Sequence, residues 1–182
     1  MRASSRHVAF LRGINVGRAK RIAMADLRAL VEDLGFRDVR TVLNSGNVVY
    51  TSPRTAPAAA AARIERAIAG ELGVSSRVVV LDGSELSAAV DRNPLVRVAG
   101  DHSRLLMYVA ASPEALGKAQ AMTTQSWGKD KVAIEGRVLY AWCSGGILAS
   151  SLREAIDRAL KDTVTSRNWA TILKLHALVA EP

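Results

Sequence analysis

The sequence contains one cysteine, three histidines and few aromatic residues, and each scarcity excludes a class of site. A single cysteine, Cys143, excludes an internal disulfide framework and any metal site built from several cysteines. The histidines, His7, His102 and His176, are isolated and lack the spacing of a metal-binding motif. Aromatic residues make up 4% of the chain, which is few for a protein that stacks nucleic-acid bases. We therefore expect neither a metal nor a cofactor.

Long apolar runs are also missing. No stretch approaches the roughly 20 apolar residues that a membrane-spanning helix needs. The first six residues lead directly into a strand-like segment, which is not the pattern of a secretory signal. Hydrophobic residues nevertheless make up 49% of the 182 residues and charged residues 23%, the profile of a packed globular protein. We therefore expect a cytoplasmic protein without a membrane partner.

Negative charge is scarce in the first half of the chain. Residues 1–83 hold 13 Lys and Arg against 7 Asp and Glu, a net of +6, out of a formal net charge of +8 for the whole chain. Residues 84–182 hold 12 against 10, a net of +2. The first half is therefore where we expect an anion to bind. A second explanation stays open, because 19 of the 25 cations are arginine, as a codon bias would produce.

The apolar pattern of residues 1–83 predicts the order strand, helix, strand, strand, helix, strand. Met24, Leu27 and Leu30 recur at helical spacing, and Pro57 suits the first turn of the second helix. Residues 44–47 read Asn-Ser-Gly-Asn, and because Asn and Gly tolerate positive φ, they predict a tight hairpin turn. The expected strands are residues 7–12, 37–43, 48–51 and 77–81, and the expected helices are residues 24–34 and 57–72.

The second half repeats this order of elements without repeating its residues. Ser112 and Pro113 predict the N-cap and first turn of a helix, and Ser151 and Glu154 have the spacing of a capping box that opens another. The other expected elements are a helix at 84–91, strands at 104–110, 131–135, 137–142 and 162–166, and a final helix at 169–179.

Two βαββαβ halves predict an α+β fold of two ferredoxin-like subdomains in tandem, residues 1–83 and residues 84–182, the second ending in an additional helix. In such a sheet, with spatial order 4-1-3-2, the loop after the first strand and the turn between the second and third lie at the same end. In this chain those segments are residues 13–22 and residues 44–47. We therefore expect them to be neighbours.

Three segments resemble a known family. They are residues 11–17 (LRGINVG), residues 43–50 (LNSGNVVY) and residues 165–171 (TSRNWAT), the last followed by Lys174 and Leu175. Together they resemble the bacterial domain-of-unknown-function family sixteen ninety-seven. The resemblance implies two ferredoxin-like α+β subdomains and supplies no established activity or catalytic residue. Members often carry a second glycine after the GINVG string, where this chain has Arg18.

Residues 13–21 are the main candidate for a binding site. Gly13 and Gly17 allow backbone N–H groups to converge, and the segment leads into a helix whose N-terminus attracts anions. It is neither a P-loop nor a dinucleotide-binding loop, because both glycine spacings are missing. A solvated surface loop is the alternative. The predicted ligand-binding residues here are Arg12, Gly13, Asn15, Gly17, Arg18, Lys20 and Arg21.

Two further segments have both a structural and a functional interpretation. In residues 44–47, turn formation alone explains Asn and Gly, whereas the functional alternative has Asn44, Ser45 or Asn47 contributing to the same site. At the start of the last helix, Asn168 suits an N-cap and Trp169 a core anchor. The alternative there is that Arg167, Asn168 and Trp169 bind a planar or anionic ligand.

These residues lead to one favoured function and two alternatives. The favoured function is binding of a phosphorylated or carboxylated small molecule at residues 13–21 and 44–47. The alternatives are a nucleic-acid-binding protein that uses a basic ferredoxin-like surface, and an assembly component without its own ligand, which pairs through an open sheet edge. No general base, nucleophile or metal site is identifiable, and Cys143 resembles a core residue, so we lean against an enzyme.

Overall fold

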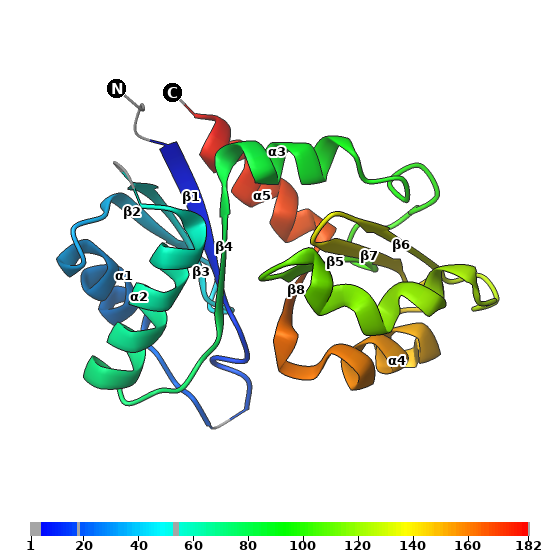
Figure 1. Cartoon of the computed structure of the whole chain (residues 1–182), viewed down its shortest axis with the longest axis horizontal. Coiled ribbons are helices and arrows are strands. Elements are labelled where there is room, and N and C mark those ends of the chain that lie inside the picture. The colour runs from blue at the N-terminus through cyan, green and yellow to red at the C-terminus, as the bar shows by residue number, and fades with distance from the viewer. Residues whose placement is uncertain (1–4, 18, 53–54, 182) are drawn as a thin grey trace. The chain divides into compact units, whose positions relative to one another are not determined.

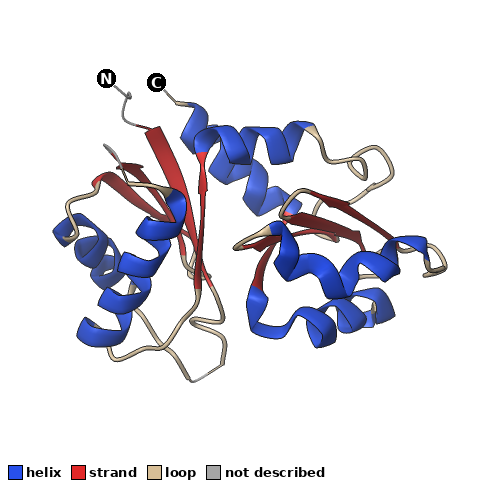
Figure 2. Ribbon diagram, in the orientation of Figure 1, coloured by secondary structure: helices blue, strands red, loops and turns tan. Residues whose placement is uncertain are grey.

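The structure is a computed structural model, and it describes residues 5–17, 19–52 and 55–181. The chain divides into two compact units, residues 1–87 with 175–182, and residues 88–174. Each unit contains one four-stranded sheet whose neighbouring strands run antiparallel, together with helices (Figures 1 and 2). The expected α+β class is confirmed.

The elements of the first unit follow the predicted order. Its sheet has the strand order β2-β3-β1-β4, so that the first strand lies between the third and the fourth. α3 follows the last strand directly, and the boundary between the two units falls within this helix, after Ser87. The bounds are β1 (Ser5–Leu11), α1 (Met24–Asp33), β2 (Arg37–Val42), β3 (Asn47–Ser52), α2 (Pro57–Glu71), β4 (Val78–Asp82) and α3 (Gly83–Asp91).

The core of the first unit lies between its sheet and the two helices that cover one face of it (Figure 1). α1 contributes Leu27 and Leu30, whose spacing of three places both on the face toward the sheet, and both are buried. α2 contributes Ile64 and Ile68 at a spacing of four, and both are completely buried. Burying each such side chain stabilises the fold by about 1.5–3 kcal/mol. This packing fixes where α1 begins relative to the sheet.

The second unit contains a sheet of the same kind. Its strand order is β6-β7-β5-β8. The core cluster includes the completely buried Leu116, Leu152 and Ile156. The bounds are β5 (Leu105–Ala110), η1 (Pro113–Thr124), β6 (Lys131–Glu135), β7 (Val138–Trp142), η2 (Ile147–Ala149), α4 (Ser151–Leu160), η3 (Lys161–Thr163), β8 (Val164–Asn168) and α5 (Trp169–Ala180), whose last residues belong to the first unit.

Two helix starts differ from the predictions. The segment after Ser112 is a 3₁₀ helix, and the Ser112 side chain makes no capping hydrogen bond. Its buried residues Leu116 and Ala119 are three apart, which matches the three-residue turn of a 3₁₀ helix. The cap of α4 is Ser150 rather than Ser151, because the Ser150 hydroxyl accepts a hydrogen bond from the Arg153 N–H at 3.1 Å.

None of the helices in the described part of the chain combines the length and the apolar character that a membrane crossing demands.

Candidate functional site

The loop between β1 and α1 (residues 12–23) is held at its start by the residues that immediately precede the two neighbouring strands, β3 and β4. The Leu11 N–H donates to the Gly46 oxygen at 2.8 Å, in the turn between β2 and β3 (residues 43–46). The Arg12 N–H donates to the Arg77 oxygen at 2.9 Å, and the Ser76 hydroxyl donates to the Arg12 oxygen at 2.9 Å. The loop therefore leaves the sheet from a fixed position.

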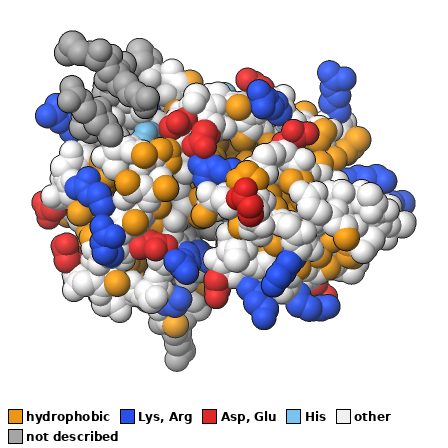
Figure 3. Space-filling view, viewed as in Figure 1, with side chains coloured by type: hydrophobic (Ala, Val, Ile, Leu, Met, Phe, Trp, Pro, Cys, Tyr) orange, Lys and Arg blue, Asp and Glu red, His pale blue; other side chains and the backbone are white. Residues whose placement is uncertain are grey.

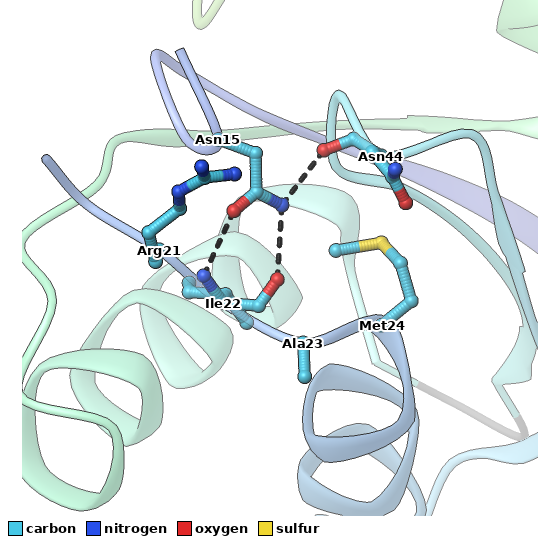
Figure 4. Close-up of a pocket in the computed structure, with 6 residues that line it drawn as sticks. All are labelled: Asn15, Arg21, Ile22, Ala23, Met24 and Asn44. Carbon is cyan, nitrogen blue, oxygen red and sulfur yellow. Dashed lines mark hydrogen bonds between the residues drawn. The ribbon is translucent and has the colours of Figure 1, made fainter. Parts of the chain in front are cut away.

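Asn15 joins this loop to the turn. Its side-chain Nδ2 donates to the Ile22 oxygen at 2.9 Å and to the Asn44 oxygen at 2.8 Å, and its Oδ1 accepts from the Ile22 N–H at 2.9 Å (Figure 4). The Asn15 N–H donates to the Lys20 oxygen at 3.0 Å, which closes the loop on itself. The expectation that the loop and the turn are neighbours is confirmed.

The turn between β2 and β3 is packed against the same loop. Gly46 is buried with a φ of +79°, and a Cβ added there would lie 2.7 Å from Ile14 Cδ1 and 2.8 Å from Leu11 Cβ. The sequence suggested positive φ at Asn and Gly, but the second such residue is Leu43, with a φ of 59°. Leucine adopts this conformation only at a cost of about 1–2 kcal/mol.

Positive φ is concentrated in these two segments. Of the five non-glycine residues with positive φ in the described chain, three lie here: Asn15, Lys20 and Leu43. Gly13 and Gly17 also have positive φ, at 65° and 64°. Backbone held in rarely populated conformations is found more often at functional sites than elsewhere, because the surrounding structure must maintain it. The loop therefore has a defined shape.

A hollow of about 330 Å³ lies between the loop and the turn. This volume is at the lower end of the range for small-molecule sites, about 300–1,000 Å³. Arg21 and the side chains of Asn15, Asn44 and Met24 surround it in Figure 4. We call it the Asn15 hollow; its lining residues are Asn15, Arg21, Ile22, Ala23, Met24 and Asn44.

The hollow lies at the N-terminus of α1, which has no side-chain cap. The N-cap residue is Ala23, and its methyl group can accept no hydrogen bond. The N–H groups of the first helical turn have no partner within the helix and carry partial positive charge. One group opposes an anion there, the exposed carboxylate of Asp26 in the first turn of α1.

Two of the predicted basic residues have exposed side chains. Lys20 and Arg21 are exposed, and within the described part of the chain neither forms an ion pair with a carboxylate. Only Arg21 lines the hollow. Arg12 is half-buried, and Arg18 lies outside the described residues.

Ser45 and Asn47 contribute to the turn itself. The Asn47 side chain is completely buried, and its Nδ2 donates to the Val42 oxygen at 2.7 Å and to the Ser45 hydroxyl at 3.0 Å. Both amide hydrogens of Asn47 therefore serve the hairpin. Asn44 differs, because it is exposed and lines the hollow.

The three predicted residues near the C-terminus belong to the second unit, whereas the Asn15 hollow belongs to the first. Asn168 caps α5, since its Oδ1 accepts from the Thr171 N–H at 2.9 Å. Trp169 is 1% exposed and makes an edge-to-face contact with Tyr140 at 6.3 Å. Arg167 Nη1 donates to the Ser166 oxygen at 2.7 Å, and burial lowers the pKa of Arg167 to about 10.

The remaining reactive side chains have structural surroundings. Cys143 is completely buried in the core of the second unit, as expected, and burial raises the pKa of its thiol. His176 contacts the Ser87 hydroxyl at 3.1 Å. Within the described residues, no group of three or more His, Cys, Asp or Glu is placed to hold a metal ion.

Sequence reasoning missed the contribution of Ile22, Ala23 and Met24 to the hollow. Met24 was expected to begin the helix, and the residues just before such a start form its N-terminal rim. An alanine at the N-cap position was the available signal, because it leaves the first-turn N–H groups without a side-chain acceptor.

Comparison with known proteins places the chain among its relatives. A family model described as "Protein of unknown function (DUF1697)" matches residues 4–140, which include the loop, the turn and α1. The chain belongs to this family. The match ends before residues 165–171, the third segment that carried the resemblance. The family membership assigns no function to the Asn15 hollow.

A similar solved structure covers nearly the whole chain. It is that of the conserved bacterial protein SP0830 from Streptococcus pneumoniae, with 20% sequence identity and a TM-score of 0.79. The similarity covers 98% of this chain and 100% of that one, and at this identity it shows the fold alone. A search of curated proteins found none that matches.

Proposed function

We propose that the protein binds the anionic group of a small phosphorylated or carboxylated molecule in the Asn15 hollow. The observation that carries this proposal is the position of Arg21 beside an uncapped helix N-terminus, in a hollow shaped by the hydrogen bonds of Asn15. The N–H groups at the start of α1 would donate hydrogen bonds to the anion's oxygens, and the Arg21 guanidinium would add charge-assisted hydrogen bonds.

The proposed site is a binding site rather than a catalytic centre. Its lining residues include no Asp, Glu, His, Cys, Ser, Thr, Lys or Tyr that could act as a general base or nucleophile. Asn44 would select among ligands, because its exposed amide offers both a donor and an acceptor. Arg12 and Lys20 would raise the local anion concentration without lining the hollow.

The finer features of the fold and location belong to the same proposal. We assign each unit a ferredoxin-like topology, supported by the element order and by the sheet orders β2-β3-β1-β4 and β6-β7-β5-β8. We also propose a cytoplasmic location, where phosphorylated metabolites are available.

Nucleic acid is the less supported partner. β3 carries one aromatic residue, Tyr50, and its side chain is buried in the core under α1 and α2, so this strand offers no aromatic ring for stacking bases. On the face drawn in Figure 3, basic side chains are interspersed with acidic ones rather than gathered in one patch. We therefore favour a small anion.

Titration with inorganic phosphate, sulfate and a set of nucleotides and sugar phosphates tests the proposal. We expect saturable shifts of the Ala23 and Met24 amide signals in nuclear magnetic resonance spectra, and about tenfold weaker binding in Arg21→Ala. Arg66→Ala is the matched control, since Arg66 is an exposed arginine of α2 that does not line the hollow. Equal loss of binding in both variants, or no saturable shift with any anion, would contradict the proposal.

A further inference from the structure

The outer strand β6 has an edge that no strand of the described chain pairs with. Its partner in the sheet is β7, and the register runs without a shift from Lys131 opposite Trp142 to Glu135 opposite Val138. An unpaired edge presents a row of N–H and C=O groups that can pair with another strand.

The other three outer strands are protected in different ways. β4 is mostly buried, and no residue of β8 is fully exposed, since two are buried and three half-buried. β2 is exposed but irregular, because its register shifts between Arg37 and Arg40 and Asp38 has a φ of 51°. Bulges and charges of this kind prevent edge-to-edge pairing. β6 has neither a bulge nor a charge in its middle, and its charged residues are confined to its two ends.

We propose that β6 pairs antiparallel with β6 of a second copy of this chain. The sequence of the strand, Lys-Val-Ala-Ile-Glu, is self-complementary about Ala133. In a two-fold arrangement centred there, Lys131 lies opposite the second copy's Glu135, and Val132 lies opposite the second copy's Ile134. Each opposite-charge pair and each apolar pair occurs twice, as a two-fold axis requires.

The backbone N–H and C=O groups of β6 point in the directions that this pairing requires. β6 and β7 are joined by a two-residue turn at 136–137, so Glu135 and Val138 form the hydrogen-bonded pair that closes the hairpin. Because the pairs alternate along an antiparallel ladder, Val132 and Ile134 direct their N–H and C=O groups away from β7. In the proposed pairing these two residues are the ones that face each other and exchange hydrogen bonds.

The side chains of β6 also suit the proposed pairing, because apolar and charged residues lie on opposite faces of the sheet. Val132 and Ile134 are half-buried against the core of the second unit, so a second copy would cover what remains exposed of them. Lys131 and Glu135 are exposed and, since side chains alternate along a strand, lie on the opposite face with Ala133. Five residues from each copy make a small interface, so the dimer is weak and depends on concentration.

Cysteine substitution tests the register directly. In the proposed dimer, Ala133 lies opposite Ala133 of the second copy, in a pair without hydrogen bonds. The Cα atoms of such a pair lie about 4.5 Å apart, which is within disulfide range. We expect Ala133→Cys to form a covalent dimer under copper–phenanthroline oxidation. Val132→Cys is the matched control, because residue 132 of one copy lies diagonally across from residue 132 of the other, at about 7–8 Å. Cross-linking of both variants alike, or no cross-linking of Ala133→Cys, would overturn the proposal.

Charge reversal tests the same interface without oxidation. In sedimentation experiments we expect Lys131→Glu and Glu135→Lys each to weaken the dimer by about tenfold, because two attractive pairs become repulsive. The double variant should restore it. Lys161→Glu, beside the outer strand at the far edge of the sheet, should leave it unchanged. A wild-type protein that stays monomeric at every concentration, or a dimer that the single variants do not weaken, contradicts the pairing.

Discussion

The side-chain amide of Asn15 donates a 2.8 Å hydrogen bond to the main-chain oxygen of Asn44, 29 positions further along the chain. The same amide group holds both the N–H and the oxygen of Ile22, two residues before α1 begins. One side chain therefore positions the loop, the turn and the start of the helix relative to one another. The shape of the Asn15 hollow depends on it.

Two substitutions of Asn15 should separate the contribution of its side-chain hydrogen bonds to stability from the contribution of its positive φ. Asn15→Gly keeps the positive φ but removes three side-chain hydrogen bonds, and we expect a loss of about 1–2 kcal/mol for this half-buried residue. Asn15→Ala should lose about 1 kcal/mol more, because alanine is disfavoured at a φ of 55°. Urea unfolding measures both, and equal stability of the two variants would exclude a contribution from φ.

Gly46 should tolerate no side chain. In Gly46→Ala the new Cβ would lie 2.7 Å from Ile14 Cδ1, so the loop and the turn must separate, and we expect a loss of about 2–4 kcal/mol. Gly17→Ala is the control, since Gly17 also has positive φ but nothing lies within 4 Å of its added Cβ. Denaturant unfolding should give the control a loss of only about 1 kcal/mol. Similar losses would mean that backbone conformation alone matters at Gly46.

Asp26 should weaken anion binding at the start of α1. Removing its charge in Asp26→Asn should tighten binding of inorganic phosphate about two- to fivefold, because a carboxylate in the first turn competes with the anion for the helix N-terminus. Asp33→Asn changes the net charge equally at the last residue of α1 and is the control. Titration calorimetry that shows the same gain in both variants would indicate an effect of net charge only.

Two buried tyrosines should respond differently to loss of their hydroxyl group. Tyr140 Oη donates to the Ala89 oxygen at 2.7 Å, so Tyr140→Phe should cost about 1–2 kcal/mol. Tyr50 Oη is buried and has no hydrogen-bond partner in the part of the chain that the structure describes, so Tyr50→Phe should be neutral or stabilising. Thermal unfolding of the two variants measures this contrast, and a comparable loss in Tyr50→Phe would show that its hydroxyl has a partner in solution.

His7 should make the first unit less stable at mildly acidic pH. The side chain is 2% exposed, its Nδ1 has no hydrogen-bond partner among the described residues, and burial lowers its pKa, although Asp82 and Glu85 partly oppose this. The unfolded chain therefore takes up a proton more readily than the folded one. The stability associated with neutral His7 is complete above the unfolded pKa of about 6.5 and decreases as the pH falls below it.

Urea unfolding between pH 8 and pH 5 tests this dependence. The difference in stability between the wild type and His7→Gln should be constant above about pH 7 and should shrink below about pH 6.5 by about 1.4 kcal/mol for each unit of pKa shift. Comparison with a variant at the same pH removes the contribution of the carboxylates. A difference that does not change with pH would show that His7 titrates as in the unfolded chain.

Short-range patterns in the sequence were enough to predict the order of helices and strands. They also predicted that the loop after β1 lies beside the turn between β2 and β3. Helical spacing at Leu27 and Leu30, a proline in the first turn of α2 and an Asn-Ser-Gly-Asn turn are signals carried by adjacent residues. Once the strand order of a βαββαβ unit is assumed, geometry alone places residues 13–22 beside residues 44–47. Asn168 as the cap of α5 was predictable for the same reason.

Only the tertiary structure decided which polar side chains make hydrogen bonds within the fold and which remain available to a ligand. Asn47 and Asn44 look alike in sequence, yet one is buried in the hairpin and the other lines the hollow. Ser150 rather than Ser151 caps α4, because Asp130, distant in the chain, accepts a 2.7 Å hydrogen bond from the Ser150 hydroxyl. Such choices depend on partners that are brought together by packing, and no local pattern records them.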